Sequence, residues 1–172
     1  MRNFSGGSDE DMAKTPSRDF AASALFQQRL SDALAGEAGS NADIAGRMGI
    51  SKDVLIRALR AGLIPGTRSL IKIADYTGSS VDFLLGLTDT DCCAATAEGA
   101  TFQGRLQELA RRRGVKYGRI AADIGISRSL FNAWAQNGYI PSAEIAYQLA
   151  LYFSVSLDYL LGRTDAERYA RP

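Results

Sequence analysis

The sequence predicts an all-α protein built from two similar helical domains in tandem. Apolar residues recur at helical spacing along most of the chain, and serine and glycine residues mark the expected helix starts and ends. The second part of the chain also repeats the first at a constant offset of 76 residues. Such an offset is too long for a solenoid repeat and fits a small domain.

The repeat pairs residues 26–89 with residues 102–165 without a gap, and about a third of the 64 positions are identical. The closing segments are the most alike, with GSSVDFLLGLTD at 78–89 and SVSLDYLLGRTD at 154–165. We therefore expect one domain at 21–89, a linker at 90–101, a second domain at 102–165 and a tail at 166–172. Residues 1–20 contain few apolar side chains and are expected to form a disordered arm.

In the second copy, the spacing of apolar residues predicts the first two helices. A first helix is predicted from Phe102 to Gly114, with Leu106 and Leu109 on its inner face. A short second helix is predicted from about Tyr117, and a tight turn at Gly125 follows it.

Serine and glycine residues delimit the remaining helices of this copy. Ser127 is a natural N-cap for a third helix through about Gln136, and the left-handed preference of Gly138 ends that helix. A fourth helix is expected to begin at 141–142. Ser156 is expected to cap a short fifth helix, with Asp158 near the positive end of that helix. The first copy follows the same plan, with Ser40 and Ser51 as caps.

Composition argues against several classes of function. The chain has no histidine and no glycine-rich phosphate loop, so we expect no enzyme, no metal site and no cofactor. No apolar run approaches the roughly 18 residues of a membrane span, and the N-terminal residues have no signal-peptide pattern. These features predict a cytoplasmic protein without a membrane partner. Cys92 and Cys93 are expected to be free thiols in the linker.

The string RIAADIGISRSLFNAWAQNGYIPSAEIAYQLALYFSVSLDYLLG, at residues 119–162, resembles the Cro/CI (XRE-type) helix-turn-helix family of bacterial and phage regulators. The features in common are the alanine and glycine of the two-helix motif, Trp134, Pro141 and the closing S-x-D-x-L-L-G. The first copy departs from the family pattern at Ala58, which stands where the tryptophan is expected. The resemblance implies two tandem five-helix, lambda-repressor-like domains, each with a third helix that enters the DNA major groove.

By position, the resemblance places base-edge contacts at the start of each third helix. Arg128 is suited to guanine and Asn132 to adenine, whereas Asp53 could accept from cytosine and Ile56 could touch a thymine methyl. Asn41 and Tyr117 stand where the family often has a glutamine that binds phosphate. The complete set of implied DNA-binding residues is Asn41, Ser51, Lys52, Asp53, Ile56, Arg57, Tyr117, Ser127, Arg128, Ser129, Asn132 and Ala133.

The second copy carries the densest basic run, and its members are candidate phosphate contacts: Arg111, Arg112, Arg113, Lys116 and Arg119. A solvated helix end is the alternative interpretation of this run. Residues 26–89 contain seven basic and seven acidic residues, whereas residues 102–165 contain eight basic and five acidic. We therefore expect the second copy to bind nucleic acid more strongly than the first.

Two functions remain open on the sequence. The first is a sequence-specific regulator that binds double-stranded DNA, as a phage or mobile-element repressor or activator, in the bacterial nucleoid. The second is a protein-interaction module, such as an antitoxin or an antagonist of another regulator. The neutral first copy, with Val54 and Ile56 expected to be exposed, keeps this second function open. Further partners considered are the transcription machinery and a second copy of the chain, which would pair through the fifth helices around Phe83 and Tyr159.

The two third helices differ at nearly every expected contact position, so the sequence predicts an asymmetric target. Half-sites in this family lie about 34–36 Å apart. The linker from Asp91 to Thr101 could span about 36–40 Å when fully extended. One chain is thus expected to cover two unlike half-sites about one helical turn apart.

Overall fold

The computed structural model describes residues 22–91 and 100–168. The predicted disordered arm therefore lies outside the described residues, as do Cys92 and Cys93 of the linker and residues 169–172 of the tail. The described chain is all-helical, and its one β-type contact is an isolated bridge between Ala22 and Leu63. None of the helices in these ranges is long and apolar enough to cross a bilayer.

Five helices form the first half of the structure. They are α1 (Ala24–Ala33), α2 (Asn41–Met48), α3 (Lys52–Ala61), α4 (Thr67–Thr77) and α5 (Val81–Leu84). The predicted caps Ser40 and Ser51 are confirmed, because their hydroxyl groups accept hydrogen bonds from the third residue of α2 and α3. Asp43 completes a capping box by accepting from the backbone N–H of Ser40.

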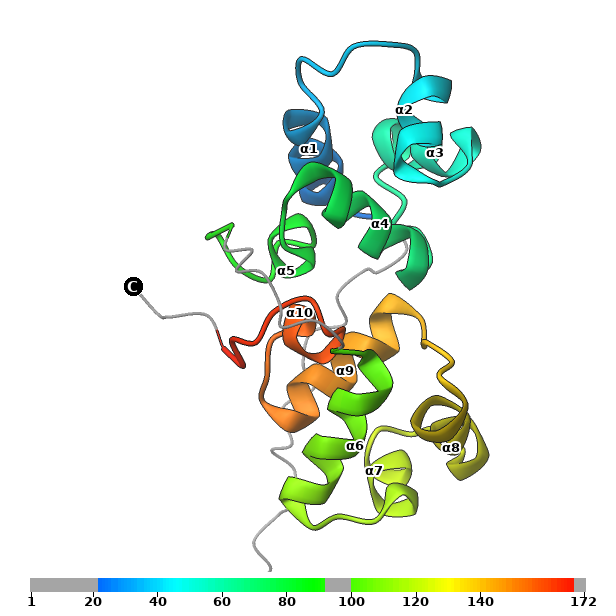
Figure 1. The fold of residues 1–172 in the computed structure, drawn as a ribbon, viewed down its shortest axis with the longest axis vertical. Helices are drawn as coiled ribbons and strands as arrows, with labels where there is room; N and C mark the ends of the chain where they lie inside the picture. The colour runs from blue at the N-terminus through cyan, green and yellow to red at the C-terminus, as the bar shows by residue number, and fades with distance from the viewer. Residues whose placement is uncertain (1–21, 92–99, 169–172) are drawn as a thin grey trace, which may run out of the picture.

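Five helices form the second half. They are α6 (Phe102–Arg113), α7 (Tyr117–Asp123), α8 (Arg128–Asn137), α9 (Ala143–Phe153) and α10 (Leu157–Leu160). Ser127 and Ser156 cap α8 and α10 as predicted, and Gly114 and Gly138 end α6 and α8 in the left-handed conformation. The two halves follow one another along the long axis of the molecule (Figure 1).

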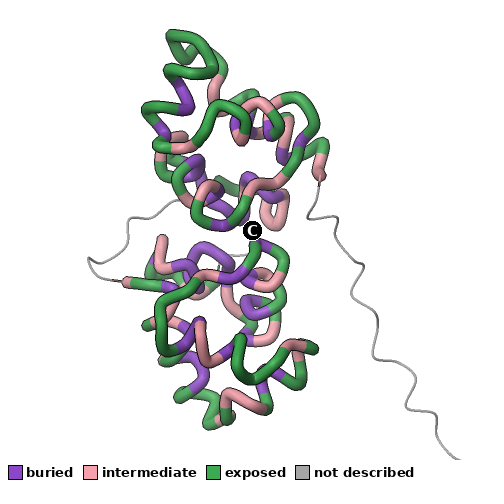
Figure 2. The backbone as a smooth tube through the Cα atoms, turned by 90° about the vertical axis from the view of Figure 1, so that its right-hand side faces the viewer, coloured by how far each residue is buried: buried purple, intermediate pink, exposed green. Residues whose placement is uncertain are grey.

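Within each half, the third helix is the centre of packing. Helix α3 packs on α1 and α2, and α8 packs on α6 and α7. Leu55 and Phe131, at equivalent positions of α3 and α8, are both fully buried. Trp134 is also buried, whereas Ala58 takes its place in α3. Figure 2 shows buried residues inside each half and also where the halves meet.

Residues that are identical in the two copies make identical contacts. Gln27 donates its side-chain N–H to the carbonyl of Leu59 at 2.8 Å, and Gln103 donates to the carbonyl of Ala135 at 3.1 Å. These bonds tie the first helix of each half to the last turn of the third helix, where backbone carbonyls lack helical partners.

Arg29 and Arg105 also occupy equivalent positions in the two halves and make equivalent contacts. The guanidinium of Arg29 lies 4.0 Å from the ring centroid of Phe83 and pairs with Asp89, and Arg105 lies 4.2 Å from that of Tyr159 and pairs with Asp165. The near-identical closing segments are therefore required by the interior of each half.

The two halves meet at α5 and α10 through a reciprocal exchange of carboxylates. Asp158 accepts from the backbone N–H groups of Val81 at 3.0 Å and Asp82 at 2.9 Å, at the start of α5. Asp82 accepts from Leu157 at 3.1 Å and Asp158 at 2.7 Å, at the start of α10. Each carboxylate thus satisfies the first two N–H groups of the other half's helix.

Asp158 lies in the first turn of α10, as the sequence predicts, but its carboxylate binds the other half. The third N–H of α10 is satisfied locally by Ser156, at 3.1 Å. The side chain of Asp158 instead crosses to α5, where it is buried between the halves. The sequence does not show this contact, because a place in the first turn of a helix does not specify which helix receives the carboxylate.

The apolar fifth helices pack against each other within one chain. Val81, Asp82, Leu157 and Asp158 are buried where α5 and α10 pack on each other. The hydroxyl of Thr67 donates to the carbonyl of Pro141 at 2.5 Å and extends the contact between the halves. Much of the apolar surface of the fifth helices is therefore buried within one chain, whereas Phe83 is only half-buried.

Gly62, which ends α3, permits a close approach that a side chain would prevent. Its φ is +61°, and a Cβ there would lie 2.4 Å from the carbonyl oxygen of Ser23.

We expect Gly62→Ala to lower the free energy of unfolding by about 2–4 kcal/mol, from left-handed strain plus a backbone clash. Urea unfolding measures this loss. The matched control is Gly78→Ala, with φ +69° and open space around it, which should cost only about 1 kcal/mol. Equal losses in the two variants would contradict the role of the close approach.

Candidate nucleic-acid interface

The second and third helices of each half are joined by the same tight turn. In the second half, Gly125 has φ +73° and the backbone N–H of Ile126 donates to the carbonyl of Ala121 at 2.9 Å. In the first half, Gly49 has φ +70° and Ile50 donates to Ala45 at 3.0 Å. The turn leaves the start of α3 and α8 exposed to solvent. Figure 1 shows these two helices on the same side of the molecule, towards its two ends.

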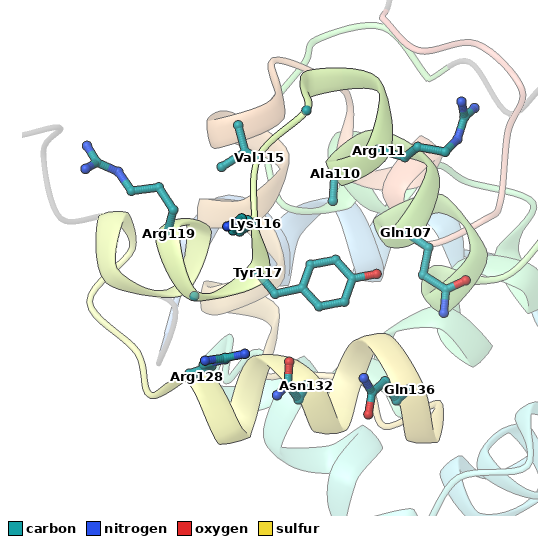
Figure 3. Close-up of a pocket in the computed structure, with 12 residues that line it drawn as sticks. Gln107, Ala110, Arg111, Val115, Lys116, Tyr117, Arg119, Arg128, Asn132 and Gln136 are labelled. Carbon is teal, nitrogen blue, oxygen red and sulfur yellow. The ribbon is translucent and has the colours of Figure 1, made fainter.

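An open groove of about 770 Å³ lies between α6, α7 and α8. Many of the residues predicted to contact DNA line it, together with two glutamines that were not predicted. Figure 3 shows Arg128, Asn132 and Gln136 in a row along α8, with the ring of Tyr117 facing them from α7. The complete lining is Gln107, Ala110, Arg111, Gly114, Val115, Lys116, Tyr117, Gly118, Arg119, Arg128, Asn132 and Gln136.

Four cationic side chains border this groove, and three of them make no ion pair within the described residues: Arg111, Lys116 and Arg128. Arg119 pairs with Asp123 at 2.8 Å, but its side chain is 75% exposed. An exposed pair of this kind contributes little and can exchange its carboxylate for another anion. The groove therefore presents positive charge that no other residue in the described part of the chain neutralises.

The basic run at 111–113 is divided between two roles. Only Arg111 lines the groove. Arg112 pairs with Glu167, and this bond raises the pKa of Arg112 further above its ordinary value. Arg113 lies over the ring of Tyr152, 5.1 Å from the centroid. The groove is thus bordered by Arg111, Lys116 and Arg119. The side chains of Arg112 and Arg113 lie outside it.

The aromatic pair Tyr117 and Phe131 fixes one wall of the groove, because their ring centroids lie 5.2 Å apart across α7 and α8. The stem of Arg128 passes over Gly118, where a Cβ would lie 3.4 Å from the Arg128 Cδ atom. At the start of α8, the Ser127 hydroxyl accepts from Leu130 at 3.2 Å and bonds the Ser129 hydroxyl at 3.1 Å.

The remaining predicted positions differ in exposure. Ser127, Arg128 and Ser129 are exposed, whereas Asn132 and Ala133 are half-buried. Two exposed apolar residues were not predicted: Leu130 on α8, 42% exposed, and Tyr139 in the following loop, 60% exposed. Leu130 could have been found from the sequence, because helical spacing places it to the side of the face formed by Phe131, Trp134 and Ala135.

The equivalent surface of the first half has a different chemistry. Ser51, Lys52, Asp53 and Arg57 are exposed on α3, and Asn41 is exposed at the start of α2. Val54 and Ile56 are half-buried, which corrects the expectation that both are exposed.

The first half also lacks cations at the positions where the second half carries them around the groove. The positions that match Arg111, Lys116 and Arg119 hold Ala35, Ser40 and Asp43. Hydrogen bonds from Ser40 lower the pKa of Asp43, so this carboxylate is charged at neutral pH.

A nearby cation is neutralised within the same half. Arg47 pairs with Glu37 at 2.9 Å. Hydrogen bonds from Tyr76 and then from Arg47 lower the pKa of Glu37, which keeps the pair ionised at neutral pH. The first half therefore lacks cations at the positions that match Arg111, Lys116 and Arg119, although Lys52 and Arg57 are exposed on α3.

The helix-turn-helix geometry, the open cationic groove and the exposed start of α8 describe a surface suited to a polyanion. Comparison with models of known protein families, with curated proteins and with solved structures found no match.

Proposed function

We propose that the chain is a sequence-specific transcription regulator that binds double-stranded DNA, with each half acting as a lambda-repressor-like helix-turn-helix domain. The observation that carries the proposal is the groove between α6, α7 and α8. It combines cations without ion-pair partners with the polar, exposed first turn of α8. Cations of this kind neutralise phosphates, while polar side chains on a helix can read base edges.

The two halves take unequal parts in this function. The second half supplies most of the affinity, because the phosphate-facing cations lie there. The first half contributes mainly sequence preference through Lys52, Asp53 and Arg57, which are exposed on α3. Since α3 and α8 lie on the same side of the molecule, one chain can address two unlike half-sites on one DNA duplex.

Fluorescence anisotropy with a random-sequence 30-base-pair duplex, measured from 0.05 to 0.3 M salt, tests the proposal. Binding that weakens linearly in log–log form as salt rises is the expected result. Selection from a randomised DNA library should then return a non-palindromic sequence. Absence of binding at the lowest salt would reject the proposal.

That negative result would favour the second candidate, a protein-interaction module. The acidic side chain of Asp43 favours this alternative for the first half, because it occupies the position that Arg119 holds at the groove of the second half.

Arg128→Ala is expected to weaken specific binding by about 1–3 kcal/mol and to relax the preference at one base pair. Its guanidinium lies on the exposed first turn of α8, beside the groove. Library selection with the variant measures the change. Arg112→Ala is the matched control, because its charge is already paired with Glu167 and lies outside the groove. Unchanged preference in the Arg128 variant would exclude base reading by this residue.

A further inference from the structure

The joint between the halves buries two carboxyl groups against each other. Asp82 is 5% exposed and Asp158 is 1% exposed, and the carboxyl group of each accepts a hydrogen bond from the backbone N–H of the other. Two carboxylates without a proton would repel strongly in such a site. A proton on one carboxyl removes this repulsion, because the protonated group can donate to its ionised neighbour.

Neighbouring groups decide which carboxyl keeps its charge. Arg163, only 8% exposed, donates to the Asp158 carboxylate and also to the carbonyl of Ser79 at 3.2 Å. The equivalent position in the first half is Leu87, which carries no charge. Asp158 is therefore the ionised member of the pair and Asp82 the protonated one.

Other charged groups around the joint do not reverse this assignment. Asp75 on α4 is mostly exposed and bonds to Arg163 at 3.0 Å. Asp91 accepts from the backbone N–H of Ser80 at 2.8 Å, before α5. On α1, Arg29 donates to the carbonyls of Phe83 and Thr88, and its charge is paired with Asp89.

We propose that Asp82 and Asp158 form a proton-dependent lock that positions the two halves relative to each other, and that loss of the shared proton loosens the joint. The lock consists of the reciprocal bonds from each carboxyl to the start of the other half's helix. If both carboxyls were ionised, their mutual repulsion would weaken those bonds. The inference depends on the joint alone and does not require that the chain bind DNA.

The pH range of the lock follows from the two carboxyls. Burial and then the hydrogen bond with Asp158 raise the pKa of Asp82 from 3.8 to about 7. Stabilisation from this proton is therefore complete below the ordinary pKa and is lost as pH rises through about 7.

Asp158 has the opposite dependence. Burial tends to raise its pKa, but hydrogen bonds with Asp82 and the charge of Arg163 outweigh burial and lower the pKa of Asp158. Its contribution is lost only as pH falls below the ordinary range. The lock is thus strongest in mildly acidic solution and opens on the alkaline side of neutrality.

NMR on the isotopically labelled full chain tests the lock directly. Carboxyl carbon shifts of Asp82 and Asp158, followed from about pH 5 to 9, should show one titration with a midpoint near 7. Over the same range, the backbone N–H groups of Val81 and Leu157 should lose about tenfold in exchange protection, after correction for intrinsic exchange. Core N–H groups such as that of Leu106 should not change.

Three variants separate a proton lock from a merely structural contact. Asp82→Asn removes the titration and should make the protection independent of pH. Arg163→Gln removes the cation beside Asp158, so the midpoint should rise by about half a unit or more. Asp32→Asn, an exposed carboxyl on α1, is the control and should leave the midpoint unchanged.

Two results would overturn the proposal: titration of both carboxyls below pH 5, or protection that stays constant up to pH 8.5. Because neither measurement requires DNA, failure of the lock is distinguishable from failure of the proposed function. A library selection at pH 6 and pH 8.5 then adds a functional readout. A fixed spacing between two half-sites at pH 6 and variable spacing at pH 8.5 is the expected result.

Discussion

Replacing Asp158 with alanine is expected to lower the free energy of unfolding by about 3–5 kcal/mol. The substitution leaves the N–H groups of Val81 and Asp82 without their acceptor and removes a carboxylate partner of the buried Arg163. A buried charge that loses its partner is among the most costly changes in a folded protein. Urea unfolding at pH 6, where the joint is closed, measures the effect.

Two further variants rank the contributions at the joint. Asp82→Ala should cost less than Asp158→Ala, because Arg163 keeps its bond to Asp158. Asp75→Ala, which removes a 61% exposed carboxylate from the same arginine, should cost less than about 1 kcal/mol. A loss below 1 kcal/mol for Asp158→Ala would mean that the halves are stable without the exchanged carboxylates.

The triple variant Arg111→Gln, Lys116→Gln and Arg119→Gln is expected to lower DNA affinity about 10²–10³-fold at 0.1 M salt. All three side chains line the groove, and each phosphate contact releases close to one counterion. The slope of log affinity against log salt should therefore become shallower by about 2.7. Anisotropy titrations on the random duplex, at several salt concentrations, measure both quantities.

A second triple variant distinguishes the groove from net charge. Arg112→Gln, Arg113→Gln and Arg168→Gln remove the same three charges, but all three side chains lie outside the groove. Their partners are Glu167, the ring of Tyr152 and the carbonyl of Ser154, respectively. We expect a much smaller change in slope. Equal slopes for the two triple variants would show that DNA responds only to overall charge.

Local features of the fold could be predicted from the sequence. A serine cap such as Ser127 and a glycine terminus such as Gly138 depend on a few neighbouring residues, so the sequence predicts them, and the structure confirms both. The duplicated contacts of Gln27 and Gln103 are a different case. Their repetition was visible, but the carbonyls that they bind come from a helix about 30 residues away.

The candidate site was partly predictable in the same sense. Helical geometry already separates the three consecutive arginines, because Arg111 follows Gln107 by four residues and Arg113 follows the buried Leu109 by four. Gln107 and Arg111 both line the groove, and Arg113 turns to the rings of α9. The joint between α5 and α10 was not predictable, since it depends on which surfaces of two packed domains meet.

The single arginine at the joint has a consequence for symmetry. In a dimer of identical chains, every substitution appears on both sides of the two-fold axis, so such a joint would hold two arginines or none. Here Arg163 stands on one side and Leu87 on the other, although the backbone N–H of each donates to the backbone carbonyl of the aspartate five residues earlier. When both copies belong to one chain, each side of the joint can carry its own substitutions. One of two otherwise equivalent aspartates can then stay ionised while the other titrates. The sequence of a symmetric dimer could not assign these two roles to particular residues, because its two aspartates have identical neighbours.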